Sequence, residues 1–131
     1  MAQFKCIVVT PEDTVTDTEA DFVALPLYDG EVGIAPGHGP MIGRLGYGEL
    51  RLKVGESLTR YYLDGGFVQV DDGVVSVLTS RAILAEDLKE DEIQQAISEI
   101  SGTSAAGEEA IQSRERQLQQ ARAQLQVARK K

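Results

Sequence analysis

The sequence predicts a β-sandwich of about ten short antiparallel strands, followed by a C-terminal α-helical hairpin. Three observations support this fold class. Residues 3–78 contain short β-branched and aromatic runs that turn residues separate. After residue 78 the apolar residues recur at helical spacing. A Ser/Gly-rich segment, residues 101–107, then divides the helical part in two. We therefore expect a sandwich domain over residues 1–86 and a helical hairpin over residues 87–131.

Length and composition narrow the class of protein further. With 131 residues and a hydrophobic fraction of 42%, the chain can bury one core of ordinary size. We expect no membrane insertion, because no run approaches the ~18 apolar residues that a membrane span requires. A formal net charge of −8 argues against nucleic-acid binding, which needs clustered Lys and Arg. Cys6, the only cysteine, is interpreted as a small buried hydrophobic residue.

Two hairpins are the clearest elements of the β part. In residues 49–63 a strictly alternating strand is followed by a turn at Gly55 and by a returning strand. In residues 67–78 two β-branched runs flank the sequence DDG, and Asp-Gly is a favoured pair in tight hairpin turns. Further β-rich runs cover residues 4–10 and 22–27.

Two other glycine clusters lie among these strands. Gly46-Tyr47-Gly48 is interpreted as a turn. Gly65-Gly66 lacks the spacing of a phosphate-binding loop, so we interpret it as a tight strand connection with close backbone packing.

A glycine- and proline-rich stretch, residues 29–40 (DGEVGIAPGHGP), has four glycines and two prolines in twelve residues. We expect a turn, a short strand over residues 31–34, and a loop whose entry and exit directions Pro36 and Pro40 fix. Such a preformed loop suits docking to a partner. Its His38 is the only histidine of the chain, so a catalytic or metal-binding role is disfavoured. A docking contact and a local hydrogen bond within the turn both remain open for His38.

The first helix is expected to begin near Asp87. Asp87 with Glu90 three residues later has the pattern of a capping box. Ile93 and Ile100 belong to one apolar stripe, and Gly102 ends the helix.

The second helix is expected to run from about residue 108 to the C-terminus. Ile111, Leu118 and Leu125 recur every seven residues in a narrow apolar stripe. Because this helix is much longer than the first, part of it must stay solvated or be covered by another protein.

The hairpin is polarised in charge. Residues 88–109 carry a net charge of −5 and residues 110–131 a net charge of +5. The basic side chains either form a solvated face that pairs partly with the acidic helix, or meet an acidic surface elsewhere. The candidate contact residues are Arg114, Arg116, Arg122 and Arg129, followed by Lys130 and Lys131.

Taken together, these motifs resemble the epsilon subunits of bacterial and chloroplast F-type ATP synthases. The resemblance covers nearly the whole chain and includes residues 63–67 (LDGGF) and residues 75–79 (VSVLT). It rests on these matching positions of the loop and the next strand: Glu31, Gly33, Ile34, Pro36, His38, Pro40, Gly65 and Gly66.

The resemblance implies a ten-stranded sandwich and a non-catalytic central-stalk subunit that couples rotation of a c-subunit ring to the catalytic head. The six matching loop residues, from Glu31 to Pro40, would form the docking loop for the gamma subunit and the c ring. The four arginines of the second helix would contact an acidic loop of the catalytic beta subunits and so inhibit ATP hydrolysis. The subunit would lie peripherally on the cytoplasmic face of the bacterial inner membrane, or on the stromal face of the thylakoid.

Some members of this family bind ATP through an Ile-Asp-x-x-Arg-Ala motif at the start of the first helix. The matching residues here are 88–93 (LKEDEI), which begin with Leu88 and end with Ile93. Lys89 replaces the aspartate and Glu92 replaces the arginine, so an acid would face the phosphates. We therefore expect no nucleotide, cofactor or metal. The alternative function is a free-standing adaptor that binds an unrelated protein through the sandwich.

Overall fold

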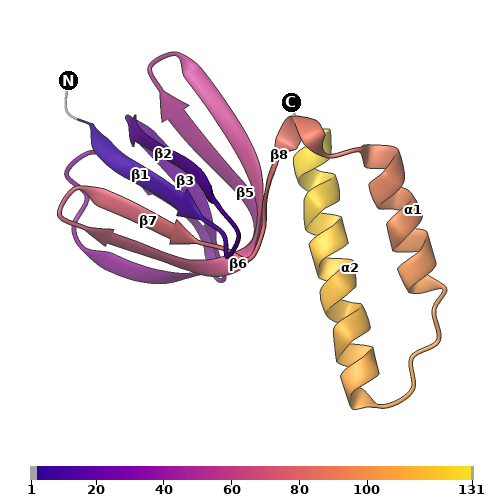
Figure 1. The fold of residues 1–131 in the computed structure, drawn as a ribbon. Coiled ribbons are helices and arrows are strands. Elements are labelled where there is room, and N and C mark those ends of the chain that lie inside the picture. Colours follow the sequence, from indigo (N-terminus) through magenta and orange to yellow (C-terminus); the bar gives the residue numbers. More distant parts are fainter. Residues whose placement is uncertain (1–2, 131) are drawn as a thin grey trace.

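The computed structural model describes residues 3–130, which form a β-sandwich with a helical hairpin beside it (Figure 1). The predicted fold class is confirmed. The strands are β1 (Phe4–Val9), β2 (Thr14–Ala20), β3 (Phe22–Leu27), β4 (Gly30–Ile34), β5 (Met41–Val54), β6 (Ser57–Asp71), β7 (Val74–Leu78) and β8 (Ala82–Leu84). A 3₁₀ turn, η1 (Ala85–Asp87), leads to α1 (Glu90–Ser101) and α2 (Glu108–Arg129).

The strands pair in the order β2-β1-β7-β6-β5-β3-β4, and β8 adds to β6. Every pair is antiparallel except β1 with β7, which is parallel. The expectation of antiparallel strands throughout is therefore wrong at this pair. A tight hairpin turn forces antiparallel pairing, but β1 and β7 are far apart in the sequence and no such turn joins them.

Both predicted hairpins are confirmed. Gly55 and Glu56 turn the chain between β5 and β6, and Asp72-Gly73 turns it between β6 and β7. Asp72 and Gly73 both have positive φ, 49° and 74°. That combination is typical of the type I′ turn, which matches the twist of the flanking strands.

Strands β5 and β6 are long, 14 and 15 residues, and each bends sharply at glycines. In β5 the core-facing side changes from odd to even positions between Leu45 and Leu50. In β6 it changes between Leu63 and Val68. Because side chains alternate strictly along a regular strand, such a reversal requires an irregularity in the backbone. Strand β6 thus covers two runs that the sequence separates, and β5 continues through the residues expected to form a turn, so the described residues contain eight strands and not about ten.

The two glycine clusters cause these bends without ending the strands. The turn predicted at Gly46-Tyr47-Gly48 is wrong, because these residues lie inside β5 and Tyr47 pairs with Asp64 of β6. Gly65-Gly66 likewise lies inside β6 and does not connect two strands. The close backbone packing expected there is present, since a Cβ on Gly66 would collide with the carbonyl oxygen of Leu78.

The core lies between the layers of the sandwich. Its members are mostly Val, Leu and Ile from all the long strands, with Phe4 and Cys6 from β1. Cys6 is fully buried, as predicted, and burial raises the pKa of its thiol to about 12. Among the described residues, the members of this cluster all come from the strands.

The helices differ from prediction mainly at the start of α1. Asp87 belongs to η1, and α1 begins at Glu90 with Lys89 at the N-cap and no side-chain capping bond. The predicted capping box is therefore wrong, because the 3₁₀ turn takes up the residues that would have formed it. Gly102 at the C-terminus of α1 and the start of α2 at Glu108 agree with prediction.

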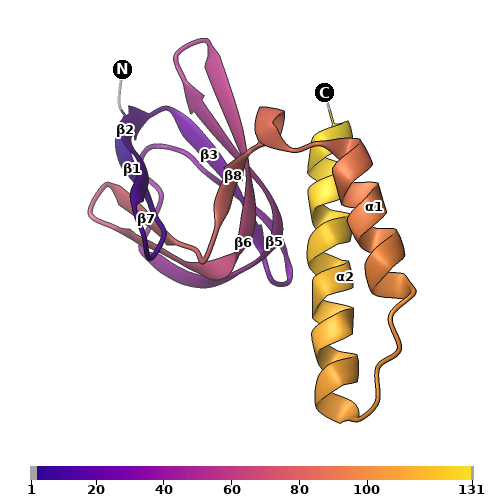
Figure 2. The same cartoon turned by 45° about the vertical axis from the view of Figure 1, so that its right-hand side comes forward.

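Helix α2 lies between α1 and the sandwich, as both views show (Figures 1 and 2). Its buried residues are Leu118, Ala121 and Val127. The end of the hairpin that contains the interhelical loop extends beyond the sandwich, and Ile111 near that end is 44% exposed. Part of the long helix is thus solvated. No helix within residues 3–130 is long and apolar enough to cross a membrane.

Candidate functional site

The predicted docking loop lies at the edge of the sandwich. Strand β4 ends the strand order, with β3 as its single neighbour among the described strands, and the loop continues from it to β5. Glu31, Gly33, His38 and Pro40 are exposed, and Pro36 is half-buried. Ile34 differs from the rest, because its side chain is 1% exposed and belongs to the core. Ile34 therefore anchors the loop and presents no docking contact of its own here.

His38 makes local hydrogen bonds. Its backbone N–H donates to the carbonyl oxygen of Ala35 at 3.2 Å, which closes a turn. Its Nδ1 lies 2.7 Å from the carbonyl oxygen of Gly39, a distance at which Nδ1–H donates. The local role left open by the sequence is thus present, while the imidazole remains exposed at the surface.

Glu31, at the start of β4, forms a bidentate ion pair with Arg51 of β5. Arg51 Nη2 donates to Glu31 Oε1 at 2.9 Å, and Arg51 Nη1 donates to Oε2 at 3.1 Å. The fork geometry of guanidinium fits both carboxylate oxygens. This pair connects the docking loop to the outer face of the sandwich.

Glu49 is the centre of the polar contacts on that outer face. Its side chain is only 8% exposed, yet it contacts three basic side chains. Arg51 Nη1 lies 3.2 Å and Lys130 Nζ 3.4 Å from Oε1, and Arg60 Nε donates to Oε2 at 2.6 Å. Burial opposes ionisation of Glu49, but the hydrogen bonds from Arg60 and Arg51 outweigh it and hold the pKa of the carboxyl below its usual value.

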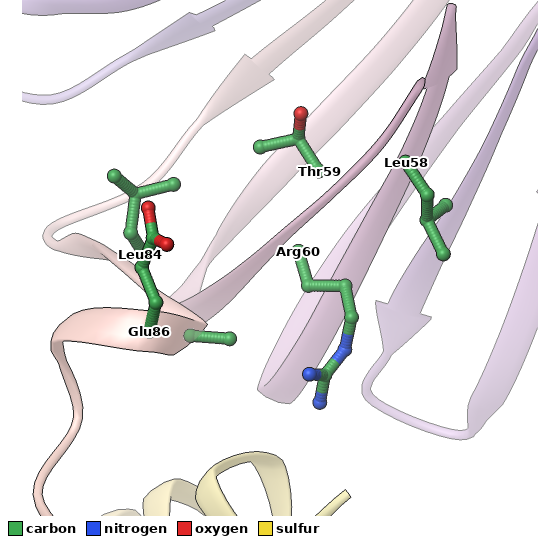
Figure 3. Close-up of a pocket in the computed structure, with 6 residues that line it drawn as sticks. Leu58, Thr59, Arg60, Leu84 and Glu86 are labelled. Atoms are coloured by element: carbon green, nitrogen blue, oxygen red, sulfur yellow. The ribbon is translucent and has the colours of Figure 1, made fainter. Parts of the chain in front are cut away.

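Arg60 joins this carboxylate to the end of α2. Figure 3 shows its side chain pointing away from Thr59 and toward α2, beside a pocket of about 260 Å³. Arg60 Nη2 donates to the carbonyl oxygen of Val127 at 2.8 Å. The last carbonyls of a helix have no partner within the helix, so a cation from the sandwich stabilises this terminus.

A second polar contact lies nearer the middle of α2. Gln120 Nε2 donates to Asp64 Oδ1 at 3.0 Å, and the fully buried Tyr62 donates its O–H to the same oxygen at 2.7 Å. Burial, with the neighbouring Asp64, raises the pKa of Tyr62. Tyr62 therefore stays a neutral donor beneath the helix.

The four arginines of α2 have different surroundings. Arg129 Nε donates to Glu90 Oε1 of α1 at 2.5 Å, and Arg114 Nη1 donates to the carbonyl oxygen of Thr103 at 3.0 Å. Arg116 and Arg122 are exposed and make no ion pair within residues 3–130. The predicted pairing of the basic helix with the acidic one is thus present at Arg129. Lys131 lies outside the described residues.

The sequence analysis did not identify the polar contacts on the outer face, although the charged residues of the predicted hairpin could have indicated them. The register of the hairpin places Arg51 directly opposite Arg60. Two like charges at such positions destabilise a sheet unless an acid lies between them, and Glu49 is that acid.

An exposed apolar cluster was also missed. Ile42, Phe67 and Leu78 are 77%, 58% and 53% exposed. Phe67 lies directly opposite Leu78 on β7 and opposite Arg44 on β5, two residues from Ile42. Large apolar side chains gathered on one exposed face are typical of a protein–protein contact.

The chain matches the family model of the ATP synthase delta/epsilon chain, β-sandwich domain, over residues 3–85. It is similar to the ATP synthase epsilon chain of Rhodopirellula baltica, with 49% identity over 125 residues, 95% of this chain and 98% of that one. It is also similar to the ATP synthase epsilon chain of a Janthinobacterium species, with 37% identity over 123 residues, 92% of this chain and 83% of that one.

Two solved structures share the fold. A chain from the Euglena gracilis mitochondrial ATP synthase (OSCP/F1/c-ring) matches with a TM-score of 0.85 and 22% identity, covering 94% of this chain and 79% of that chain. A chain from the Tetrahymena thermophila mitochondrial ATP synthase central stalk/c-ring matches with a TM-score of 0.75 and 11% identity, covering 95% of both chains.

Proposed function

The chain belongs to the family of ATP synthase delta/epsilon chains, and from this membership we propose that it is a non-catalytic epsilon subunit of the central stalk of an F-type ATP synthase. In this role the sandwich docks to the gamma subunit and the c-subunit ring and couples their rotation to the catalytic head. The hairpin restrains ATP hydrolysis. The subunit lies peripherally, on the cytoplasmic face of the bacterial inner membrane or the stromal face of the thylakoid.

The docking surface is proposed at the edge of the sandwich. Glu31, His38 and Pro40 are exposed on a loop whose shape two prolines restrict, so little conformational entropy is lost on binding. The exposed cluster of Ile42, Phe67 and Leu78 adds apolar area on the sandwich. Both features favour docking to another protein over a catalytic role for this surface.

The observation that carries the regulatory proposal is the way α2 is held. Its hydrogen bonds and ion pairs to the sandwich include those of Gln120, Lys130 and the carbonyl of Val127. Two of its arginines, Arg116 and Arg122, are exposed without an ion pair within the described residues. Since Leu118, Ala121 and Val127 are buried as well, a partner surface that replaces both the apolar and the polar contacts would let α2 exchange positions at a small net cost in free energy. We propose that α2 leaves the sandwich and contacts the catalytic beta subunits through these arginines, with Arg114 and Arg129 joining once α2 also separates from Thr103 and Glu90 of the hairpin.

The test is ATP hydrolysis by the assembled complex with three forms of the chain. A chain that ends at Asp87 is expected to raise hydrolysis while proton coupling is retained. Arg116→Ala with Arg122→Ala is expected to raise it too, and the matched control, Gln112→Ala with Gln126→Ala on the same helix, is expected to leave it unchanged. Unchanged hydrolysis with both the truncated and the arginine forms would refute the inhibitory role.

Assembly provides the test of docking. The full chain is expected to co-purify with gamma, and combined substitution of Glu31 and His38 by Ala is expected to weaken proton coupling. A chain that fails to assemble with gamma would instead favour the free-standing adaptor.

No nucleotide is proposed for this subunit. The first turn of α1 contains Glu90, Asp91 and Glu92, which would repel phosphate groups. Isothermal calorimetry with MgATP is expected to detect no binding at concentrations up to about millimolar. The free energy of binding would then be weaker than roughly −4 kcal/mol. A micromolar dissociation constant would contradict this expectation.

A further inference from the structure

Charged side chains form a continuous chain of contacts from the docking loop to the C-terminal end of α2. It begins at Glu31 on β4, passes through Arg51 and Glu49 of β5, and reaches Lys130 at the end of α2. Arg60 on β6 joins it at Glu49 and contacts the carbonyl of Val127. The docking edge and the hairpin therefore share one ion-pair network.

Two atoms of this network each contact two partners. Arg51 Nη1 contacts both Glu31 Oε2, at 3.1 Å, and Glu49 Oε1, at 3.2 Å. Glu49 Oε1 in turn contacts both Arg51 Nη1 and, at 3.4 Å, Lys130 Nζ. The other oxygen, Oε2, is taken by Arg60. Arg51 and Lys130 thus lie at the same carboxylate oxygen, where their like charges repel each other.

The sign of the effect follows from the repulsion between Arg51 and Lys130. When Glu31 is neutralised or engaged elsewhere, the positive charge of Arg51 is balanced by Glu49 alone. The charge of Arg51 is then less well balanced, and it repels Lys130 at the end of α2 more strongly, whereas Arg129 is paired with Glu90. The field of the helix dipole at this end, about half a negative charge, acts in the opposite direction but is smaller than the unit charge of Lys130. The attachment of α2 is weakened.

We infer that Glu31 and the hairpin are energetically coupled, so that a partner group that hydrogen-bonds Glu31 loosens the hold of the sandwich on the C-terminal end of α2. This inference rests on the proposed function, in which α2 leaves the sandwich. Because coupling free energies are reciprocal, release of α2 also strengthens binding of that partner to the loop.

The test uses the full chain alone and measures how often α2 is detached. Spin labels are placed on cysteines introduced at exposed Glu56 in the β5–β6 turn and exposed Gln126 in α2, and pulsed electron resonance gives their distance distribution. Cys6 is fully buried and stays unlabelled. The distance distribution is recorded at increasing urea concentrations, and the urea concentration at which half of the molecules have α2 detached is determined. Extrapolation to water then gives the ratio of detached to attached forms, even where the detached form is rare.

Glu31→Gln is expected to raise that ratio about 1.5- to 5-fold, the range that corresponds to a partly exposed ion pair. Asp29→Asn is the matched control, since Asp29 is an exposed acid two residues away that makes no ion pair among residues 3–130, and it is expected to change nothing. In a Lys130→Gln background, Glu31→Gln is expected to have no further effect. Arg51→Gln is expected to abolish the response to Glu31→Gln as well.

Two results would overturn the inference. One is an equal effect of Glu31→Gln and Asp29→Asn, which would show that the change in net charge, and not the ion-pair network, controls detachment of α2. The other is an effect of Glu31→Gln that persists unchanged in the Lys130→Gln background. Neither result bears on ATP hydrolysis by the complex assembled with the truncated chain, so the proposed function is tested separately.

Discussion

Glu49 is a carboxylate almost excluded from solvent, and three basic side chains from two parts of the molecule surround it. A buried charge without partners is expensive, while the same charge with good hydrogen bonds is tolerated. Because Arg51, Arg60 and Lys130 lie on β5, β6 and at the end of α2, this one residue connects strand pairing to hairpin attachment.

Substitution of Glu49 is expected to have a pH-dependent cost. The lowered pKa means that the folded state favours the ionised form, so the stabilisation is fully present above the ordinary glutamate pKa of about 4.3 and is lost as pH falls through the lower, folded value. Glu49→Gln is expected to lower the free energy of unfolding by about 1–2 kcal/mol near neutral pH, since its partners are partly exposed. Urea titrations at several pH values check this. A difference from wild type that grew at acid pH would contradict it.

The stability of the sandwich is also expected to require a glycine at position 66. Its φ of +117° is unfavourable for any side chain, and a Cβ would strike the carbonyl of Leu78. Gly66→Ala is expected to destabilise the chain by about 3 kcal/mol or more, measured by urea denaturation. Gly73→Ala is the matched control, because Gly73 also has positive φ but open space around it, and should cost about 1–2 kcal/mol. Equal costs at the two positions would show that the close approach is unimportant.

At the level of secondary structure, α2 is held by a mixture of apolar and polar contacts. Leu118, a member of the predicted seven-residue stripe, is buried together with Ala121 and Val127, whereas Ile111, the first member of that stripe, is exposed. Because α2 has α1 on one side and the sandwich on the other, its buried surface is wider than a stripe facing one partner helix, and it includes Val127.

Val127→Ala is expected to loosen this helix while the sandwich stays folded. The loss of two buried methyl groups costs about 1.6 kcal/mol, which corresponds to a roughly tenfold rise in detachment. The rate of native-state trypsin cleavage at Arg122 measures it, and Gln126→Ala, at the exposed neighbouring position, is the control. An unchanged cleavage rate would show that Val127 does not contribute to the attachment.

At the level of the whole molecule, the sandwich contains the entire core cluster, and the hairpin covers only its outer face. A chain of residues 1–87 is expected to unfold cooperatively in urea and to be less stable than the full chain by about 1–3 kcal/mol, because Tyr62 becomes exposed and Glu49 loses Lys130. Circular dichroism along a urea series checks this. A broad, non-cooperative transition would show that the helices are part of the folding unit.

Much of this architecture could be predicted from local pattern. The alternation of residues 49–54, the Asp72-Gly73 turn, the helical spacing after Ile93 and the break at residues 101–107 act through backbone preferences, so each is visible in a short window of sequence. The family resemblance was likewise predictable, because its glycines and prolines occupy positions that require particular backbone geometry, and the family model over residues 3–85 confirms it.

Other features depended on contacts between distant residues. Glycines at 46, 48, 65 and 66 allow either a turn or a bend, and the long pairing of β5 with β6 decided in favour of a bend. Asp87 was available for a cap, but η1 incorporated it. Glu49, Arg60 and Lys130 are polar residues with no local partner pattern, and only the packing of α2 against β5 and β6 brings them together. The sequence by itself determined which helices and strands form, because backbone preferences act between neighbouring residues. Only the tertiary structure decided which charged side chains meet, because the free energy of such a contact depends on the distance between residues that are far apart in the sequence.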